Sequence, residues 1–154
     1  MDVQTVGELT RRTLLKFKLE DPESAAQNGK DFYTFLFTAA PDLRNFFKGA
    51  QTYTSDQIQG SERFAKQGFR LLLSQSVLSK IISDEALFTS YIRELILRHK
   101  MFKIPNDIWP AFYPLYIAFL ESKMSLTADE KKAWTILGEK FVAETVKVLN
   151  SDYY

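Results

Sequence analysis

His99 is the only histidine in the sequence, and the sequence contains no cysteine. It ends the segment FTSYIRELILRH, in which apolar residues recur at three- and four-residue steps and therefore share one face of a helix. The imidazole is the next member of that face. One interpretation is a buried histidine bonded to a backbone carbonyl, because polar groups on apolar faces usually find structural partners. The other interpretation is a ligand to a metal or a cofactor.

If His99 is a ligand, the possible sites are few, because few metal or cofactor sites can be built from one imidazole. A zinc site needs several nitrogen or sulfur ligands, and this sequence offers no thiolate to accompany His99. A haem iron differs, since the porphyrin itself supplies the in-plane ligands and the protein adds an axial one.

Enzyme motifs are mostly missing from the sequence. It contains no GxSxG, no glycine-rich phosphate loop and no HExxH. The adjacent carboxylates Asp84–Glu85 and Asp129–Glu130 are explained by helix starts, where negative charge favours the helix dipole. The sequence therefore gives no support to hydrolase chemistry.

Length and composition indicate one domain with an aromatic core. A chain of 154 residues buries roughly 70% of its unfolded surface. The 13 Phe, 7 Tyr and 2 Trp suit walls that enclose a flat ligand, and they equally suit a plain helical core. The net charge is +1, without a basic run or an acidic tail, so nucleic acid and anionic lipid are not indicated as partners.

Neither a secretory signal nor a membrane span is indicated. The first 18 residues, MDVQTVGELTRRTLLKFK, carry charge throughout and lack an apolar stretch. The longest segment free of charged and amide side chains, Trp109 to Leu120, is shorter than the roughly 20 residues of a membrane helix. We therefore expect a soluble, cytoplasmic protein.

Hydrophobic periodicity predicts an all-α chain with six or more helices and no strand. A first stripe runs from Val3 to Phe17, and Asp21–Pro22 then predicts the start of a second helix that Pro41 stops. The other expected elements are a tight segment PDLRNFF, a long helix over about 55–82, a helix over 83–99, a helix over about 105–123, and a last helix opened by the capping box Thr127 to Glu130.

Several segments resemble nematode globins, and the similarity extends over nearly the whole sequence. Pro41 is followed six residues later by Phe47, a glutamine (Gln67) lies in KQG, and the single histidine lies in RH, in globin order and spacing. The segments are FYTFLFTAAPDLRNFFKGAQTYTSD, SERFAKQGFRLLL, YIRELILRHKMFKIPNDIWPAF and DEKKAWTILGEKF. The resemblance implies a single globin domain, residues 1–154, with seven to eight helices around a haem pocket.

The resemblance also implies roles for individual residues around haem b. His99 would be the proximal ligand of the iron, and Phe47 would stack on the porphyrin. A helix-end histidine can donate its second ring N–H to a carbonyl one turn back, near Leu95, which leaves the other nitrogen for iron. Further pocket residues would be Leu71, Leu95, Ile104, Trp109 and Phe112, with Arg70 and Arg98 as candidate partners of the haem propionates or plain surface charges.

Two polar residues would face the gas ligand. Gln67 stands where vertebrate myoglobin has a histidine, and Tyr33 falls where nematode globins carry a tyrosine. Bound oxygen takes on negative charge, so each donor could contribute about 1.5 to 3 kcal/mol and slow oxygen release. Bound carbon monoxide gains little charge. The open alternatives are a core tyrosine bonded to a helix carbonyl and a solvated glutamine.

The resulting hypothesis is a haem protein that binds oxygen reversibly and tightly, for storage, transport or buffering, rather than an enzyme. Carbon monoxide and nitric oxide are expected as further ligands, and either a monomer or a homodimer is compatible with the sequence. Three alternatives stay open: nitric oxide dioxygenase or peroxidase-like haem chemistry, a gas sensor or pigment, and a helical interaction module without a cofactor.

Overall fold

The computed structural model describes residues 1–151, and within them every regular element is a helix. The all-α prediction is therefore confirmed. The elements are α1 (Val3–Leu14), η1 (Leu15–Phe17), α2 (Pro22–Ala39), η2 (Pro41–Phe46), α3 (Ser55–Gln59), α4 (Glu62–Ile81), α5 (Glu85–His99), η3 (Lys100–Phe102), α6 (Ile108–Lys123) and α7 (Ala128–Leu149), where η marks a short 3-10 helix.

These helices form two compact units. The first unit combines residues 1–13 with the chain from Val77 onward, and the second is Leu14–Ser76. The backbone of α1 and that of α4 each run through a boundary between the units.

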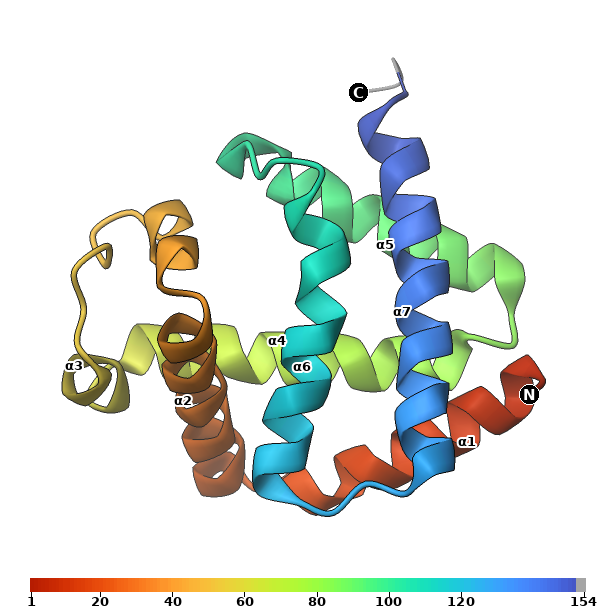
Figure 1. Cartoon of the computed structure of the whole chain (residues 1–154), viewed down its shortest axis with the longest axis horizontal. Helices are drawn as coiled ribbons and strands as arrows, with labels where there is room; N and C mark the ends of the chain where they lie inside the picture. Colours follow the sequence, from red (N-terminus) through yellow and green to blue (C-terminus); the bar gives the residue numbers. More distant parts are fainter. Residues whose placement is uncertain (152–154) are drawn as a thin grey trace. The chain divides into compact units, whose positions relative to one another are not determined.

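In the first unit α7 packs against both α5 and α6, and Figure 1 shows α6 and α7 side by side. The two helices approach closely at Gly138, where an added Cβ would lie 2.6 Å from Cγ of Tyr113. One turn before Gly138 on α7, the buried Trp134 donates its indole N–H to Oγ1 of Thr13, at 2.9 Å. This bond ties α1 to α7 inside the core of the unit.

The second unit is organised around α2, which packs against α3 and η2. One face of α2 is apolar, and its members Phe32, Tyr33, Leu36 and Phe37 are buried. Toward the start of α2, Gly29 lies against Ala65 and Phe69 of α4: a Cβ on Gly29 would sit 2.7 Å from the Ala65 carbonyl oxygen. The α4 residue opposite Gly29 is Gly68, so the two backbones meet where neither helix carries a side chain.

Three helix starts follow the predicted capping chemistry. Asp21 accepts a hydrogen bond from the backbone N–H of Ser24 and precedes Pro22, and Asp84 accepts one from the N–H of Leu87. Thr127 and Glu130 form the reciprocal capping box of α7. At the other end, α2 stops at Ala39, before Pro41, because proline cannot donate the next helical hydrogen bond.

Two helix boundaries differ from the sequence prediction. The expected helix over 55–82 is split into α3 and α4, because Thr54 caps a short helix of its own and the chain turns at Gly60 and Ser61. The expected helix from Pro105 begins only at Ile108, after a turn at residues 106 and 107. Asp107 at its start makes no side-chain cap.

The Thr127 cap makes a stability prediction. Its Oγ1 accepts the Glu130 N–H at 3.0 Å, while Glu130 Oε1 accepts the Thr127 N–H at 3.0 Å. We expect Thr127→Ala to lower the free energy of unfolding by about 1 kcal/mol, measured by urea denaturation. Thr135→Ala on the exposed face of α7 is the control and should change stability by less than about 0.5 kcal/mol. Equal losses would contradict a role for the cap.

Among residues 1–151, no helix has both the length and the apolar character that crossing a membrane requires.

Candidate functional site

In the first unit His99 is the last residue of α5, and its imidazole is oriented by its own helix. Its Nδ1 lies 2.8 Å from the carbonyl oxygen of Leu95, one turn back. A carbonyl can only accept, so Nδ1 carries the proton and donates. The predicted hydrogen bond is therefore confirmed. In the neutral ring Nε2 is then unprotonated, which is the form that binds a metal.

Aromatic rings from two other segments surround this imidazole. The Trp109 ring, on α6, has its centroid 5.8 Å from that of His99 at an interplanar angle of 74°, and the Phe102 ring, on η3, lies at 5.9 Å. Nε1 of Trp109 is buried and has no hydrogen-bond partner within residues 1–151. Leu95, one turn before His99 on α5, is buried. The imidazole is held by one polar contact and flanked by apolar rings.

In the second unit Tyr33 is the centre of what we call the Tyr33 cluster: Tyr33, Phe37, Phe47 and Phe64. The Tyr33 centroid lies 5.1 Å from that of Phe64 and 5.3 Å from that of Phe47. Tyr33 itself is 6% exposed. Burial raises the pKa of its hydroxyl well above the usual value, an effect that the charge of Arg63 partly offsets. The hydroxyl therefore stays protonated and can act as a donor.

Gln67 follows Phe64 by three residues on α4, so the two share a face of the helix. Its Oε1 is buried and has no hydrogen-bond partner within the part of the chain that the structure describes. Rotation of the terminal amide by 180° exchanges its two ends, so the same buried position can present an N–H. A buried amide without a partner is costly in a finished core and is typical of a place where a ligand binds.

The other predicted pocket residues differ in their surroundings. Leu71, Ile104 and Phe112 are half-buried, and the Phe112 ring stacks on Tyr116 at 5.8 Å. Both arginines are exposed: Nε of Arg98 pairs with Oε2 of Glu94 at 3.0 Å on the surface of α5. The surface position of Arg70 leaves its side chain in solvent.

Some residues around the candidate site were not anticipated as its neighbours. Phe37 packs on Tyr33 at 5.6 Å, and the exposed Phe102 contacts the His99 ring. Phe37 lies one turn after Tyr33 on the same helix, which is a signal that the periodicity of α2 already contains. Phe102 lies in a short 3-10 helix and has no such signal.

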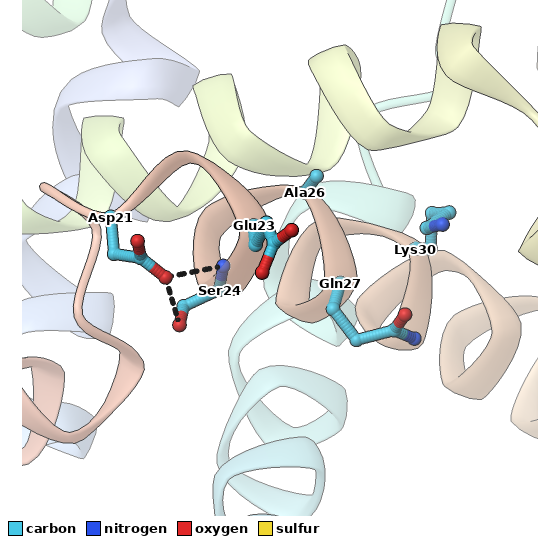
Figure 2. A pocket seen from close by; sticks show the side chains of 6 residues that line it. All are labelled: Asp21, Glu23, Ser24, Ala26, Gln27 and Lys30. Carbon is cyan, nitrogen blue, oxygen red and sulfur yellow. Dashed lines mark hydrogen bonds between the residues drawn. The ribbon is translucent and has the colours of Figure 1, made fainter.

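A shallow hollow on the surface of α2 is not part of either aromatic group. Figure 2 shows its lining side chains on the first turns of the helix, where Asp21 accepts hydrogen bonds from the backbone N–H and the hydroxyl of Ser24. Those polar groups cap the helix. Within residues 1–151 no group of three or more His, Cys, Asp and Glu side chains could hold a metal ion.

Comparisons with known proteins agree on one family. The sequence model named Globin matches residues 30–145. The chain is 39% identical to a globin-like protein of Caenorhabditis elegans over 145 residues, which is 94% of this chain and 91% of that protein. It is 47% identical to a myoglobin of Nippostrongylus brasiliensis over 116 residues, 75% of each chain. A solved structure titled as the globin-like protein of C. elegans matches with a TM-score of 0.93 at 39% identity, covering 97% of this chain and 94% of that one.

Proposed function

Because this chain belongs to the globin family, we propose that it is a haem protein that binds oxygen reversibly through an iron held by His99. The observation that carries the proposal is the hydrogen bond from Nδ1 of His99 to the carbonyl of Leu95, at 2.8 Å. With Nδ1 engaged in this bond, Nε2 of the neutral ring is the atom that would hold the iron. The family implies a haem, which would supply the iron that binds the gas.

The residues of the candidate site fit a haem, because two of their buried polar atoms lack hydrogen-bond partners in the described residues. Oε1 of Gln67 and Nε1 of Trp109 are buried without hydrogen-bond partners in the described part of the chain. The rings of Trp109 and Phe102 beside His99 provide flat apolar surface, as does Phe47 in the Tyr33 cluster. A porphyrin is a large, flat and mostly apolar group, and such walls suit it.

We further propose that Tyr33 and Gln67 donate hydrogen bonds to the bound gas and set a high oxygen affinity. The support is the protonated, buried hydroxyl of Tyr33 and the amide oxygen of Gln67, which is buried without a partner in the described residues. Charge-assisted hydrogen bonds are about twice as strong as neutral ones, so oxygen gains more than carbon monoxide.

The remaining assignments complete this proposal. Leu71, Leu95, Ile104 and Phe112 line the haem, and Arg70 and Arg98 are the candidate partners of its propionates. We also propose that residues 1–154 form one globin domain, which the match of the family model to residues 30–145 supports. A cytoplasmic role in oxygen storage, transport or buffering is part of the same proposal, and fractionation of the source tissue tests the location.

An absorption spectrum tests the haem directly. Titration of the purified chain with haem should produce a Soret band that saturates at one haem per chain. Its shift on adding oxygen or carbon monoxide to the ferrous protein should be reversible. A chain that develops no Soret band would rule out the proposed function and favour a helical interaction module.

The role of Tyr33 predicts a selective effect on oxygen. We expect Tyr33→Phe to raise the oxygen dissociation rate by about ten-fold or more, because one charge-assisted hydrogen bond is lost. The carbon monoxide dissociation rate should stay nearly unchanged in the same stopped-flow measurements.

Tyr53→Phe is the matched control, since Tyr53 is half-buried and its ring also contacts Phe64, at 5.9 Å. It removes a tyrosine hydroxyl from the same neighbourhood and should change neither rate by more than about two-fold. Equal acceleration of both gases in Tyr33→Phe would refute the hydrogen-bond argument.

A further inference from the structure

Arg63, the second residue of α4, reaches back to the connection that follows η2. Its Nη1 donates a hydrogen bond to the carbonyl oxygen of Lys48, at 2.8 Å. The next residue, Gly49, has a positive φ of 86°, which places the chain in a conformation that side chains disfavour. The connection therefore turns where the arginine holds it, directly after Phe47.

The same guanidinium lies over the Tyr33 cluster. Its central carbon is 5.3 Å from the centroid of the Phe64 ring, within the range of a cation–π contact. Phe64 in turn contacts Tyr33 at 5.1 Å and Phe47 at 5.8 Å. A single side chain thus contacts both the backbone beside Phe47 and the ring that packs against Tyr33.

Arg63 is also the charged group that acts on the Tyr33 hydroxyl. Its positive charge lowers the pKa of that hydroxyl, against the larger upward effect of burial. A positive charge that favours the tyrosinate also strengthens the hydroxyl as a donor and favours negative charge on any acceptor nearby. This electrostatic effect of Arg63 is separate from its contacts with the Lys48 carbonyl and the Phe64 ring.

We propose that Arg63 is a positioning and specificity residue for Tyr33: it fastens the connection carrying Phe47 onto the cluster, and its fixed charge biases the Tyr33 hydroxyl toward ligands that become negative. The second part rests on the proposed oxygen binding. The first concerns the chain alone.

Hydrogen exchange tests the fastening without any gas. The N–H groups of Ala50 and Tyr53 bond to the carbonyls of Phe47 and Ala50, at 2.9 and 3.2 Å. R63M keeps an unbranched side chain but removes the charge and the donor. We expect it to speed exchange of these two amides by about ten-fold, the factor for one charge-assisted hydrogen bond. K66M, which removes an exposed charge one turn along α4, should leave both amides unchanged.

Gas binding and infrared spectra test the charge. In R63M we expect oxygen release to accelerate by about three- to ten-fold. We also expect the stretching frequency of bound carbon monoxide to rise, because the positive potential at its oxygen is weaker. R63K keeps the charge and should restore the oxygen dissociation rate to within about two-fold of the native rate. It should also return the carbon monoxide stretching frequency to its native value.

The outcomes separate the claims. Unchanged exchange at Ala50 and Tyr53 in R63M would overturn the fastening. Oxygen release and carbon monoxide frequency equal to those of K66M would overturn the electrostatic role. A chain that binds no haem would refute the proposed function and the proposed effect of Arg63 on gas binding. The hydrogen-exchange measurement would still show whether Arg63 fastens the connection that carries Phe47.

Discussion

Replacing His99 by glycine should weaken haem binding by at least about 100-fold and abolish oxygen binding. Loss of a group that only orients a metal ligand typically costs 10- to 100-fold in affinity, so loss of the ligand itself should cost at least as much. The chain has no second imidazole or thiolate to take over. Haem titration followed at the Soret band measures the affinity, and the spectrum of the ferrous protein under oxygen measures ligand binding.

Free imidazole should restore part of the function of this variant. The Leu95 carbonyl, which accepts the Nδ1–H of His99 at 2.8 Å, becomes available to an added imidazole. Glycine is tolerated at a helix end, so α5 should persist, and circular dichroism checks this. Met101→Ala alters an exposed side chain two residues away and should bind haem normally. Unchanged haem affinity in His99→Gly would contradict the ligand assignment.

The sequence predicted local structure well wherever one residue type decides it. Asp21 before Pro22, Asp84, and the Thr127 capping box each satisfy backbone N–H groups within their own first turn, and each lies where expected. The bond of His99 to Leu95 belongs to the same class, because both partners are on one helix. Such interactions span about one turn, so periodicity is enough to predict them.

The prediction was wrong at boundaries where two signals compete. Apolar periodicity across 55–82 favoured one helix, but Gly60 and Ser61 interrupt it and Thr54 with Gln57 caps the short α3 separately. Gln59 at the end of α3 then donates to Asp31 at 3.0 Å and to Thr34 at 2.9 Å. These partners on α2 lie more than 20 residues away in sequence, so the local pattern carried no signal for them.

Side-chain contacts between distant segments could not be read from periodicity at all. Arg63 bonds the Lys48 carbonyl and lies over Phe64, and the apolar pattern of the sequence carries no signal for either contact. Gly29 and Gly68 each need the other to be small, and nothing in their sequence positions indicates that they meet. The comparison with known globins defines the family, whereas these contacts describe how this particular sequence builds the surroundings of Tyr33.

The Gly29–Gly68 contact carries the largest stability prediction. A Cβ on Gly68 would collide with the Cα, carbonyl carbon and carbonyl oxygen of Gly29, all of them backbone atoms that no rotamer change can move. We expect Gly68→Ala to lower the free energy of unfolding by about 3 kcal/mol or more, measured by urea denaturation. Helix propensity alone predicts the opposite sign, since alanine exceeds glycine by about 1 kcal/mol inside a helix.

Gly60→Ala is the control for this substitution. A Cβ at Gly60 would lie 3.6 Å from the Asp56 carbonyl oxygen, an ordinary contact, and the φ of Gly60 is −91°. That variant should change stability by less than about 1 kcal/mol. Because Gly68 precedes Leu71 and follows Gln67 on α4, separation of α2 from α4 would also shift Tyr33 relative to Gln67. In the fraction of Gly68→Ala that stays folded, we therefore expect oxygen release to be faster than in the native protein. A stable variant with native oxygen release would show that the close approach of α2 and α4 is dispensable.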